Sequence, residues 1–283
     1  MTEERPMLDV KNLSVRYRGT DTPAVRDVSF TLGRERLGIV GESGSGKSTV
    51  GRALLKLLPT AELTADRMRF EEVDLLTAPE RKMLELRGQR MSMILQDPKF
   101  SLNPIQRCGL QIAEAYRTHV RCSKGEARAK AIEMLSAVQI RDPERVFDLY
   151  PHEVSGGMGQ RIMIAMMLLA DPGLVIADEP TSALDVTVRL KVLRILDGLV
   201  REKGIGLIMI SHDLSLVRSF CDRVLIMYAG RVVETLAARD LDNARHPYTQ
   251  GLLAAQPRIG GSRDELPVLE RKDSWLEPAE ERP

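Results

Sequence analysis

A glycine-rich run near the N-terminus constrains this chain more than any other feature. Residues 41–49 read GESGSGKST, follow a short apolar stretch at 37–40, and precede a helical pattern at 50–58 that stops at Pro59. Glycines in a turn between a strand and a helix let backbone N–H groups converge on an oxyanion without Cβ clashes. The pattern G-x-x-x-x-G-K-[ST] in this context predicts a phosphate-binding P-loop rather than an ordinary Gly/Ser turn.

The positions of this loop have separate expected roles. Lys47 would reach the β- and γ-phosphates of a nucleotide, and the Ser48 hydroxyl would ligate Mg²⁺. The predicted nucleotide-binding positions are Gly41, Glu42, Ser43, Gly44, Ser45, Gly46, Lys47, Ser48 and Thr49. A P-loop alone predicts only that a nucleotide binds, so further motifs must indicate the class of protein.

A second motif ends in two carboxylates. Residues 174–179 read LVIADE and are followed by Pro180. Strands of a parallel sheet are nearly continuous in hydrophobicity, and ligands bind beyond their C-terminal ends. We expect Asp178 to bind Mg²⁺, partly through water, and Glu179 to polarise or deprotonate the attacking water. The alternative interpretation of this motif is a solvated turn. The presence of a P-loop in the same chain favours the catalytic interpretation.

A third motif lies between the first two. Residues 154–161 read VSGGMGQR and open a strongly apolar helical stretch at 162–170. A serine and two glycines at a helix N-terminus present free N–H groups and the positive end of the helix dipole. One chain is therefore predicted to carry two phosphate-binding surfaces.

With these motifs in this order, the chain resembles the ATP-binding subunit of an ABC transporter over about residues 8–256. The resemblance implies an α/β fold, a P-loop NTPase (ABC ATPase) with a RecA-like core, an antiparallel β subdomain and an inserted helical subdomain. It also implies a head-to-tail dimer, in which the signature motif of one subunit closes on ATP held by the P-loop of the other. The matching signature positions are Ser155, Gly156, Gly157 and Met158.

The resemblance assigns roles to further residues. Gln96 resembles the Q-loop glutamine, residues 182–185 (SALD) resemble the D-loop, and His212 resembles the switch histidine that follows a strand. Tyr17 matches the aromatic residue that stacks on adenine. The implied catalytic residues are Glu179, His212 and Gln96, and the implied Mg²⁺ ligands are Ser48, Gln96 and Asp178. Taken singly, a half-buried tyrosine, a surface glutamine and a core histidine are equally ordinary interpretations.

Three longer segments point to a subfamily. Residues 86–104, 149–158 and 245–253 resemble the ATPases of oligopeptide, dipeptide and nickel importers. The implied role is to energise import of peptides, nickel or a related small solute. The implied partners are a second ABC ATPase subunit, identical or distinct, two transmembrane permease subunits and, indirectly, a solute-binding protein, without nucleic acid. The implied location is peripheral, at the cytoplasmic face of the inner or plasma membrane.

Two functions from other classes are alternatives. A soluble ABC-type ATPase acting on nucleic acid usually carries tandem cassettes, a coiled coil or a zinc insertion, whereas this sequence shows one cassette and no zinc spacing. A non-catalytic scaffold in a non-transport complex would not need Glu179 and His212, and both are intact. An ATPase assay with and without candidate partners would separate these alternatives.

Composition agrees with a chain that binds neither nucleic acid nor lipid through its overall charge. Charged residues make up 29% of the 283 and leave a formal net charge of +1. The first ten residues lack the apolar core of a signal peptide, and we expect no membrane span because the longest apolar stretch ends at Asp171 and Pro172. The three cysteines are far apart, odd in number and without C-x-x-C spacing, so we expect reduced thiols rather than disulfides or zinc. Some ATPases of the group that the chain resembles carry an iron–sulfur site in the C-terminal region, and with no cysteine after Cys221 we expect none here.

The patterns along the chain predict its organisation. Residues 8–75 alternate in short apolar runs, as in half-buried antiparallel strands, and 77–169 follow helical periodicity, which predicts the helical subdomain. Strands and helices then alternate up to residue 256, where the ATP-binding domain is expected to end. The extension at 257–283 is rich in Pro, Gly and charge, and is predicted to be extended or partly disordered. Docking on the core through Trp275 is the alternative.

Overall fold

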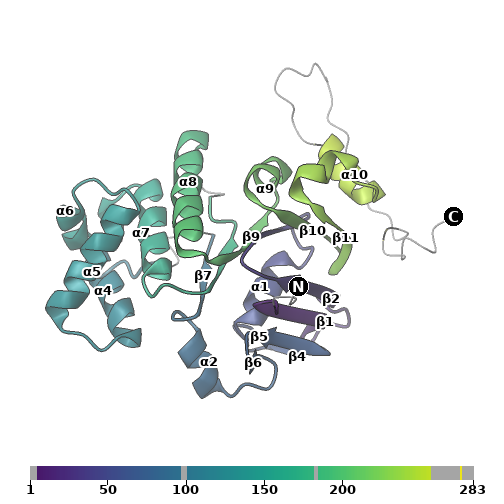
Figure 1. The fold of residues 1–283 in the computed structure, drawn as a ribbon, viewed down its shortest axis with the longest axis horizontal. Helices are drawn as coiled ribbons and strands as arrows, with labels where there is room; N and C mark the ends of the chain where they lie inside the picture. The colour runs from purple at the N-terminus through teal and green to yellow at the C-terminus, as the bar shows by residue number, and fades with distance from the viewer. Residues whose placement is uncertain (1–4, 97–100, 182–183, 256–274, 276–283) are drawn as a thin grey trace. The chain divides into compact units, whose positions relative to one another are not determined.

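The computed structural model describes residues 5–96, 101–181, 184–255 and Trp275. The chain divides into two compact units (Figure 1). The first unit comprises Met1–Ala78 together with Ile208–Pro283, and the second comprises Pro79–Leu207. The N-terminal and C-terminal parts of the sequence therefore belong to one unit, with the middle of the sequence inserted as the other.

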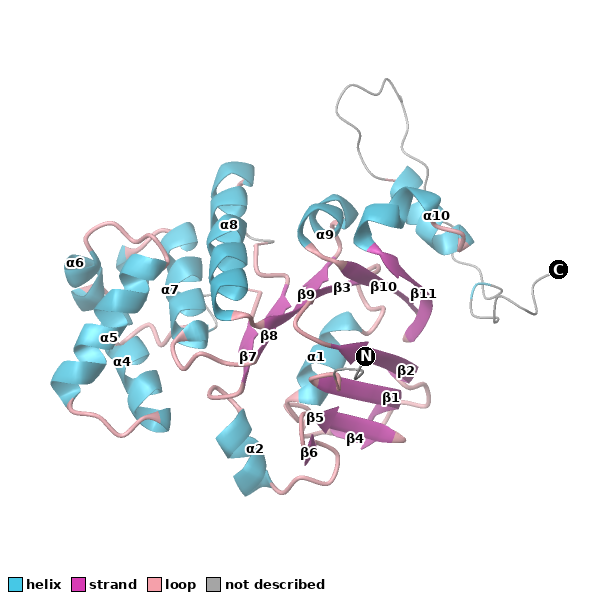
Figure 2. Ribbon diagram, viewed as in Figure 1, coloured by secondary structure: helices cyan, strands magenta, loops and turns pink. Residues whose placement is uncertain are grey.

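An antiparallel sheet forms much of the first unit (Figure 2). Its central strand β1 (Leu8–Tyr17) pairs with β2 (Val25–Leu32), β4 (Ala61–Thr64) and β5 (Arg67–Phe70), and β6 (Val73–Asp74) pairs with β5. Buried and less buried residues alternate along β2 and β5 because successive side chains point to opposite faces. The predicted antiparallel strands of this region are thus confirmed.

The remaining strands of the first unit include a parallel pair. β3 (Arg36–Val40) runs parallel to β10 (Arg223–Tyr228), and β10 pairs antiparallel with β11 (Arg231–Ala237). β3 and β10 are buried along nearly their whole length, as expected for strands covered on both faces. The helices of this unit are α1 (Lys47–Leu54), α9 (Leu214–Phe220), the short 3₁₀ helix η2 (Ala238–Asn243) and α10 (Pro247–Ala254).

The second unit is mainly helical. Its helices are α2 (Glu80–Leu86), α4 (Cys108–His119), α5 (Lys124–Ala137), α6 (Pro143–Asp148), the 3₁₀ helix η1 (Pro151–Glu153), α7 (Gly156–Leu168) and α8 (Val186–Lys203). Helices α4, α5, α6 and α7 pack against one another, as Figure 1 shows. Within the described ranges, each helix is too short or too polar to cross a bilayer.

Two parallel strands also belong to the second unit. β7 (Met91–Ile94) runs parallel to β8 (Leu174–Asp178), and both are entirely buried. β7 lies in a region whose helical periodicity does not predict it, because a four-residue apolar run is too short to show a period. A further strand, β9 (Gly206–Ser211), carries the chain from the second unit back into the first.

The three cysteines are free thiols in different surroundings. Cys108 and Cys221 are buried, and Cys122 is half-buried. Burial in apolar surroundings raises the pKa of the Cys108 thiol to about 11 and that of Cys221 to about 12. The nucleophile is the thiolate, so both buried thiols should react slowly with alkylating agents at neutral pH.

We therefore expect iodoacetamide to alkylate Cys122 well before the other two cysteines in the folded protein. The raised pKa values keep Cys108 and Cys221 protonated up to strongly alkaline pH, and burial also blocks the reagent. Peptide mapping by mass spectrometry after timed alkylation measures the order of reaction. All three should react at similar rates in denaturant, and early alkylation of Cys221 in the folded protein would contradict the expectation.

Candidate functional site

The glycine-rich loop joins β3 to α1, as the strand–turn–helix pattern predicts. α1 begins at Lys47, three residues earlier than the apolar pattern indicates, because Gly46 serves as its N-cap. Gly44 and Gly46 have φ values of 82° and 97°, in the left-handed region that glycine adopts without steric cost. The loop thus places backbone N–H groups at a helix N-terminus, where a phosphate is favoured.

Lys47 is held over this loop. The residue is 6% exposed, and its Nζ donates hydrogen bonds to the carbonyl oxygens of Gly41 at 2.8 Å and Glu42 at 2.6 Å. These contacts curl the loop around the ammonium group. The arrangement places a positive charge in the same turn as the N–H groups of the helix start, which suits a polyphosphate.

Two loop glycines have no room for a side chain. A Cβ at Gly41 would lie 2.1 Å from the carbonyl oxygen of Met227, and one at Gly46 would lie 2.5 Å from that of Ala24. Both obstructing atoms are backbone atoms, which cannot rotate away. Gly44 differs because a Cβ there would meet nothing within 4 Å.

We expect Gly46→Ala to destabilise the folded protein more than Gly44→Ala. Both substitutions force alanine into the left-handed region, which costs about 1–2 kcal/mol. Only Gly46→Ala adds a collision with the Ala24 carbonyl. Urea denaturation of the two variants measures the difference in free energy of unfolding, with Gly44→Ala as the matched control. Equal losses in the two variants would contradict the expectation.

Two other predicted residues belong to the same unit. The Tyr17 hydroxyl lies 3.4 Å from the Thr49 hydroxyl, so the tyrosine meets the first turn of α1. His212 follows β9 directly and is exposed. Its neighbour Asp213 caps α9 by accepting a hydrogen bond from the Leu216 N–H, so the histidine lies at a strand–helix junction with a capped helix start.

The carboxylate pair at the end of β8 belongs to the second unit. Asp178 is the last residue of the strand and is 4% exposed. Glu179 follows with φ 46°, a left-handed conformation uncommon for glutamate. The Gln96 Nε2 donates a hydrogen bond to Glu179 Oε2 at 3.3 Å. The structure therefore brings together a predicted catalytic carboxylate and the predicted Q-loop glutamine, which are 83 positions apart.

The serine–glycine motif forms a helix N-terminus, as predicted. Ser155 is the N-cap of α7, and its Oγ accepts a hydrogen bond from the Met158 N–H at 3.3 Å. Gly156 has open space around its Cβ position, whereas a Cβ at Gly157 would lie 2.5 Å from Val188 Cγ1. Gly156 therefore leaves its backbone accessible from outside, and Gly157 allows α8 to pack closely on the start of α7.

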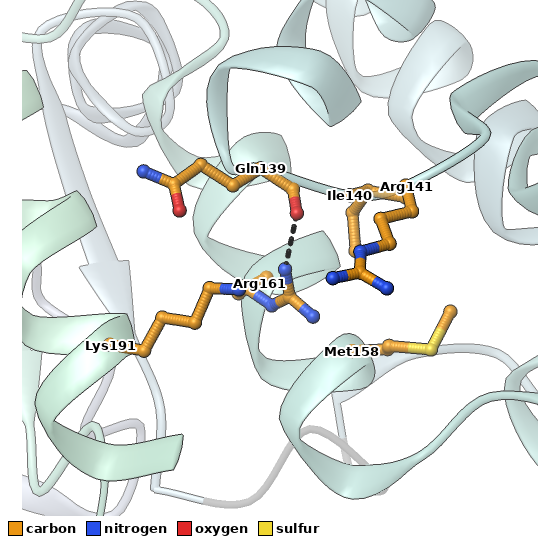
Figure 3. Close-up of a pocket in the computed structure, with 6 residues that line it drawn as sticks. All are labelled: Gln139, Ile140, Arg141, Met158, Arg161 and Lys191. Carbon is orange, nitrogen blue, oxygen red and sulfur yellow. Dashed lines mark hydrogen bonds between the residues drawn. The ribbon is translucent and has the colours of Figure 1, made fainter. Parts of the chain in front are cut away.

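A pocket of about 270 Å³ lies beside this helix start (Figure 3). Three cationic side chains line it, Arg141, Arg161 and Lys191, and its lining contains no acidic residue. Arg161 donates to the Gln139 carbonyl at 2.6 Å and to the Gly157 carbonyl at 3.2 Å. Burial lowers the pKa of Arg161. The arrangement favours an anionic group over a cationic one at this surface.

The residues predicted to bind Mg²⁺ offer a hydroxyl, an amide oxygen and a carboxylate, from Ser48, Gln96 and Asp178. Among the described residues, no group of three or more His, Cys, Asp or Glu side chains forms a metal site. Mg²⁺ prefers oxygen ligands and is usually held by one or two protein groups together with substrate phosphates and water. The donor set therefore fits a metal that arrives with a nucleotide.

Ser182 and Ala183 of the expected D-loop lie outside the described residues.

Tyr248 makes a contact with the P-loop that the sequence did not predict. Its hydroxyl accepts a hydrogen bond from the Glu42 N–H. Tyr248 belongs to the segment RHPYTQGLL, which resembles the importer ATPases but carries no chemical motif of its own.

Comparison with protein families identifies the chain. The family model described as ABC transporter matches residues 25–182, which include the P-loop, the serine–glycine helix start and the carboxylate pair. The chain belongs to the ABC transporter family. This ABC ATPase therefore has the predicted P-loop NTPase fold and binds and hydrolyses ATP.

Curated relatives match most of the ABC ATPase. A probable peptide ABC transporter ATP-binding protein of Sinorhizobium fredii is 47% identical over 93% of this chain and 81% of its own length. A probable D,D-dipeptide transport ATP-binding protein of Escherichia coli is 44% identical, with 94% and 83% covered. An oligopeptide transport ATP-binding protein of Haemophilus influenzae is 45% identical, with 93% and 83% covered.

Solved structures share the fold. A dimeric ATP-binding cassette in a post-hydrolysis state, bound to ADP and Pi, is 26% identical with a TM-score of 0.71, and the match covers 82% of this chain and 99% of the other. A Clostridium perfringens protein described as part of an ABC transporter complex is 25% identical with a TM-score of 0.72, with 85% and 92% covered. Both confirm the predicted fold class.

Proposed function

We propose that this ABC ATPase binds ATP with Mg²⁺ at residues 41–49 and uses its hydrolysis to drive import of peptides or a related small solute. The observation that carries the binding site is the buried Lys47 ammonium, held over the glycine-rich turn at the N-terminus of α1. A fixed cation and the backbone N–H groups of a helix start in one turn are the groups that a triphosphate requires. Peptide cargo is supported by the printed names of the relatives.

The proposed roles of the remaining residues follow from their chemistry. Glu179 accepts a proton from the attacking water, and Gln96 orients that carboxylate through its amide hydrogen bond. His212 stabilises the γ-phosphate, and Tyr17 contacts the adenine. Ser48, Gln96 and Asp178 would hold Mg²⁺, partly through water, and the bound ion would neutralise developing charge on the phosphates.

The signature residues have a role that needs a second cassette. Ser155, Gly156, Gly157 and Met158 form a capped helix start with an accessible backbone at Gly156. We propose that this surface binds the γ-phosphate of ATP held by a second ABC subunit. A dimeric cassette among the structural relatives supports the pairing of two subunits. The partner is either a second copy of this chain or a distinct ATPase.

The proposed assembly includes two permease subunits and, through them, a solute-binding protein, with the ATPase peripheral at the cytoplasmic face of the membrane. Co-expression with candidate permeases tests this arrangement. The ATPase should appear in the membrane fraction only when the permeases are present, and its ATPase rate should rise when they and a loaded binding protein are supplied. Co-purification with nuclease-resistant nucleic acid instead would support the nucleic-acid alternative.

Uptake of labelled cargo tests the substrate class. We expect cells that carry the complete transporter to accumulate a labelled dipeptide or oligopeptide, and cells whose ATPase carries Glu179→Gln to lose that uptake. Uptake of labelled nickel is measured in a second assay, because the subfamily resemblance includes nickel importers. Uptake of neither cargo, with ATPase activity intact, would contradict the peptide and nickel assignments.

A further inference from the structure

Three aromatic rings of the first unit form a cluster: Tyr228 at the end of β10, Tyr248 in α10, and Trp275. The centroids of Tyr228 and Tyr248 are 4.6 Å apart, and the Trp275 centroid lies 5.4 Å from the first and 5.6 Å from the second. The tilted and edge-on geometries are those that aromatic pairs prefer. Tyr248 is fully buried, and Trp275 is 9% exposed.

The Tyr248 hydroxyl connects this cluster to the P-loop. It accepts a hydrogen bond from the Glu42 N–H at 3.0 Å. The carbonyl oxygen of the same Glu42 accepts a hydrogen bond from Lys47 Nζ at 2.6 Å. Tyr248 and Lys47 therefore hold the N–H and the carbonyl group of one loop residue, and that residue stands between the strand end and the glycine turn.

The start of α10 fixes the position of Tyr248. His246 is the N-cap, and its Nδ1 accepts a hydrogen bond from the Tyr248 N–H at 3.1 Å. Pro247 occupies the first turn, where its fixed φ suits a helix and its missing N–H costs nothing. The Glu234 carboxylate of β11 accepts hydrogen bonds from the N–H groups of Arg245 at 2.7 Å and His246 at 3.3 Å.

The turn between β10 and β11 also meets the loop. The Gly230 N–H donates a hydrogen bond to the Ser45 carbonyl oxygen at 3.1 Å, and the Met227 carbonyl oxygen fills the space beside Gly41. The P-loop is therefore supported from two directions within its own unit, by the β10–β11 turn and by Tyr248. Only the second support depends on a single side-chain hydroxyl and on the rings packed against it.

We propose that Tyr248 is a positioning residue for ATP binding, and that Trp275 holds its ring in place. The hydroxyl fixes the Glu42 peptide, and the loop carbonyls of Gly41 and Glu42 in turn set the Lys47 ammonium. The nucleotide is bound by the loop and not by Tyr248 itself. This inference rests on the proposed ATP-binding role of residues 41–49.

Tyr248→Phe tests the proposal, because it removes the hydroxyl and keeps the ring. The part-buried Glu42 N–H would lose its hydrogen bond to the Tyr248 hydroxyl, so we expect the Kd for ATP to rise about five- to tenfold. The KM for ATP should rise accordingly, with kcat nearly unchanged, since the loop still binds the phosphates once ATP is seated. Tyr116→Phe is the matched control, a half-buried tyrosine on α4 in the other unit, and should leave the Kd unchanged.

Trp275 supplies a spectroscopic readout because it is the only tryptophan in the chain. We expect ATP to change Trp275 fluorescence in the unsubstituted protein. The change should be much smaller in Tyr248→Phe, which lacks the hydrogen bond to the Glu42 N–H. The emission of Tyr248→Phe without ATP should match that of the unsubstituted protein, since the ring contact remains. Altered emission together with a lower unfolding midpoint would identify a general packing defect and would overturn the positioning role.

A second variant covers the case in which Tyr248→Phe does not fold. Trp275→Phe leaves the Tyr248 hydroxyl present but shrinks the ring beside it, and we expect a smaller rise in the Kd for ATP, about twofold to threefold. An unchanged Kd in Tyr248→Phe, or in Trp275→Phe where that is the only folded variant, would overturn the inference. Lys47→Ala separates this failure from failure of the proposed function, because normal ATP binding in Lys47→Ala would remove the P-loop role itself.

Discussion

Glu179→Gln should retain ATP binding and lose ATP turnover by about a hundredfold or more. The amide has the size of the carboxylate but cannot accept a proton from water at neutral pH. Glutamine still offers a carbonyl oxygen to the Gln96 amide that now donates to Glu179 at 3.3 Å, so the local structure should persist. Steady-state ATPase assays and equilibrium binding of a fluorescent ATP analogue measure the two quantities.

Glu144→Gln is a suitable control for the loss of one carboxylate. Glu144 lies in the first turn of α6 in the same unit and is exposed, so its substitution should change neither turnover nor binding. Normal turnover in Glu179→Gln would remove Glu179 from its proposed role as the base. A variant that neither binds nor hydrolyses ATP would instead show that the glutamate is needed for the structure of the site.

Lys47→Ala has the second large expected effect, a loss of ATP affinity of about tenfold to a hundredfold. The substitution removes a charge-assisted interaction with the phosphates. It also removes the hydrogen bonds from Nζ to the carbonyl oxygens of Gly41 and Glu42, which hold the loop in its curled form. Isothermal titration calorimetry with ATP and Mg²⁺ measures the affinity directly.

Lys56→Ala is a closely matched control for Lys47→Ala. Lys56 follows α1, and its Nζ donates hydrogen bonds to the carbonyl oxygens of Leu76 and Ala78 at 3.1 Å and 3.0 Å. Both lysines thus bind backbone carbonyl groups in the same unit, but only Lys47 is proposed to bind phosphate. Lys56→Ala should lower the free energy of unfolding and leave ATP affinity unchanged. Equal loss of ATP affinity in the two variants would contradict the phosphate role of Lys47.

The strand that precedes the P-loop and the helix start at the signature motif were predictable because their determinants are local. An apolar run that ends at a glycine-rich turn indicates β3, and a serine before two glycines indicates the N-cap of α7. The strand β7 was not predictable in this way. Its four buried residues are held by pairing with β8, about 80 positions further along the chain.

Residues 245–253 show the same difference between features set locally and contacts set by the fold. They indicated only the subfamily resemblance, and the structure shows that they begin α10, with His246 as the N-cap and Pro247 in the first turn. They do not reveal that the Tyr248 hydroxyl meets the Glu42 amide, 206 positions away, or that Trp275 packs on the same ring. Trp275 packs on Tyr228 and Tyr248, and the prediction for the C-terminal extension as a whole stays a prediction. The other residues of that extension lie outside the described ones.

The amino-acid sequence by itself determined the motifs and the groups available for phosphate chemistry, because each depends on residue types at short, fixed spacings. The fold class followed from the family resemblance that these motifs carry. Only the tertiary structure decided which distant groups meet, such as Gln96 with Glu179 and Tyr248 with the P-loop. The physical reason is the separation along the sequence of the residues that interact. Backbone conformation and capping are set within a few residues, whereas a hydrogen bond between residues far apart in sequence forms only after packing has fixed both partners.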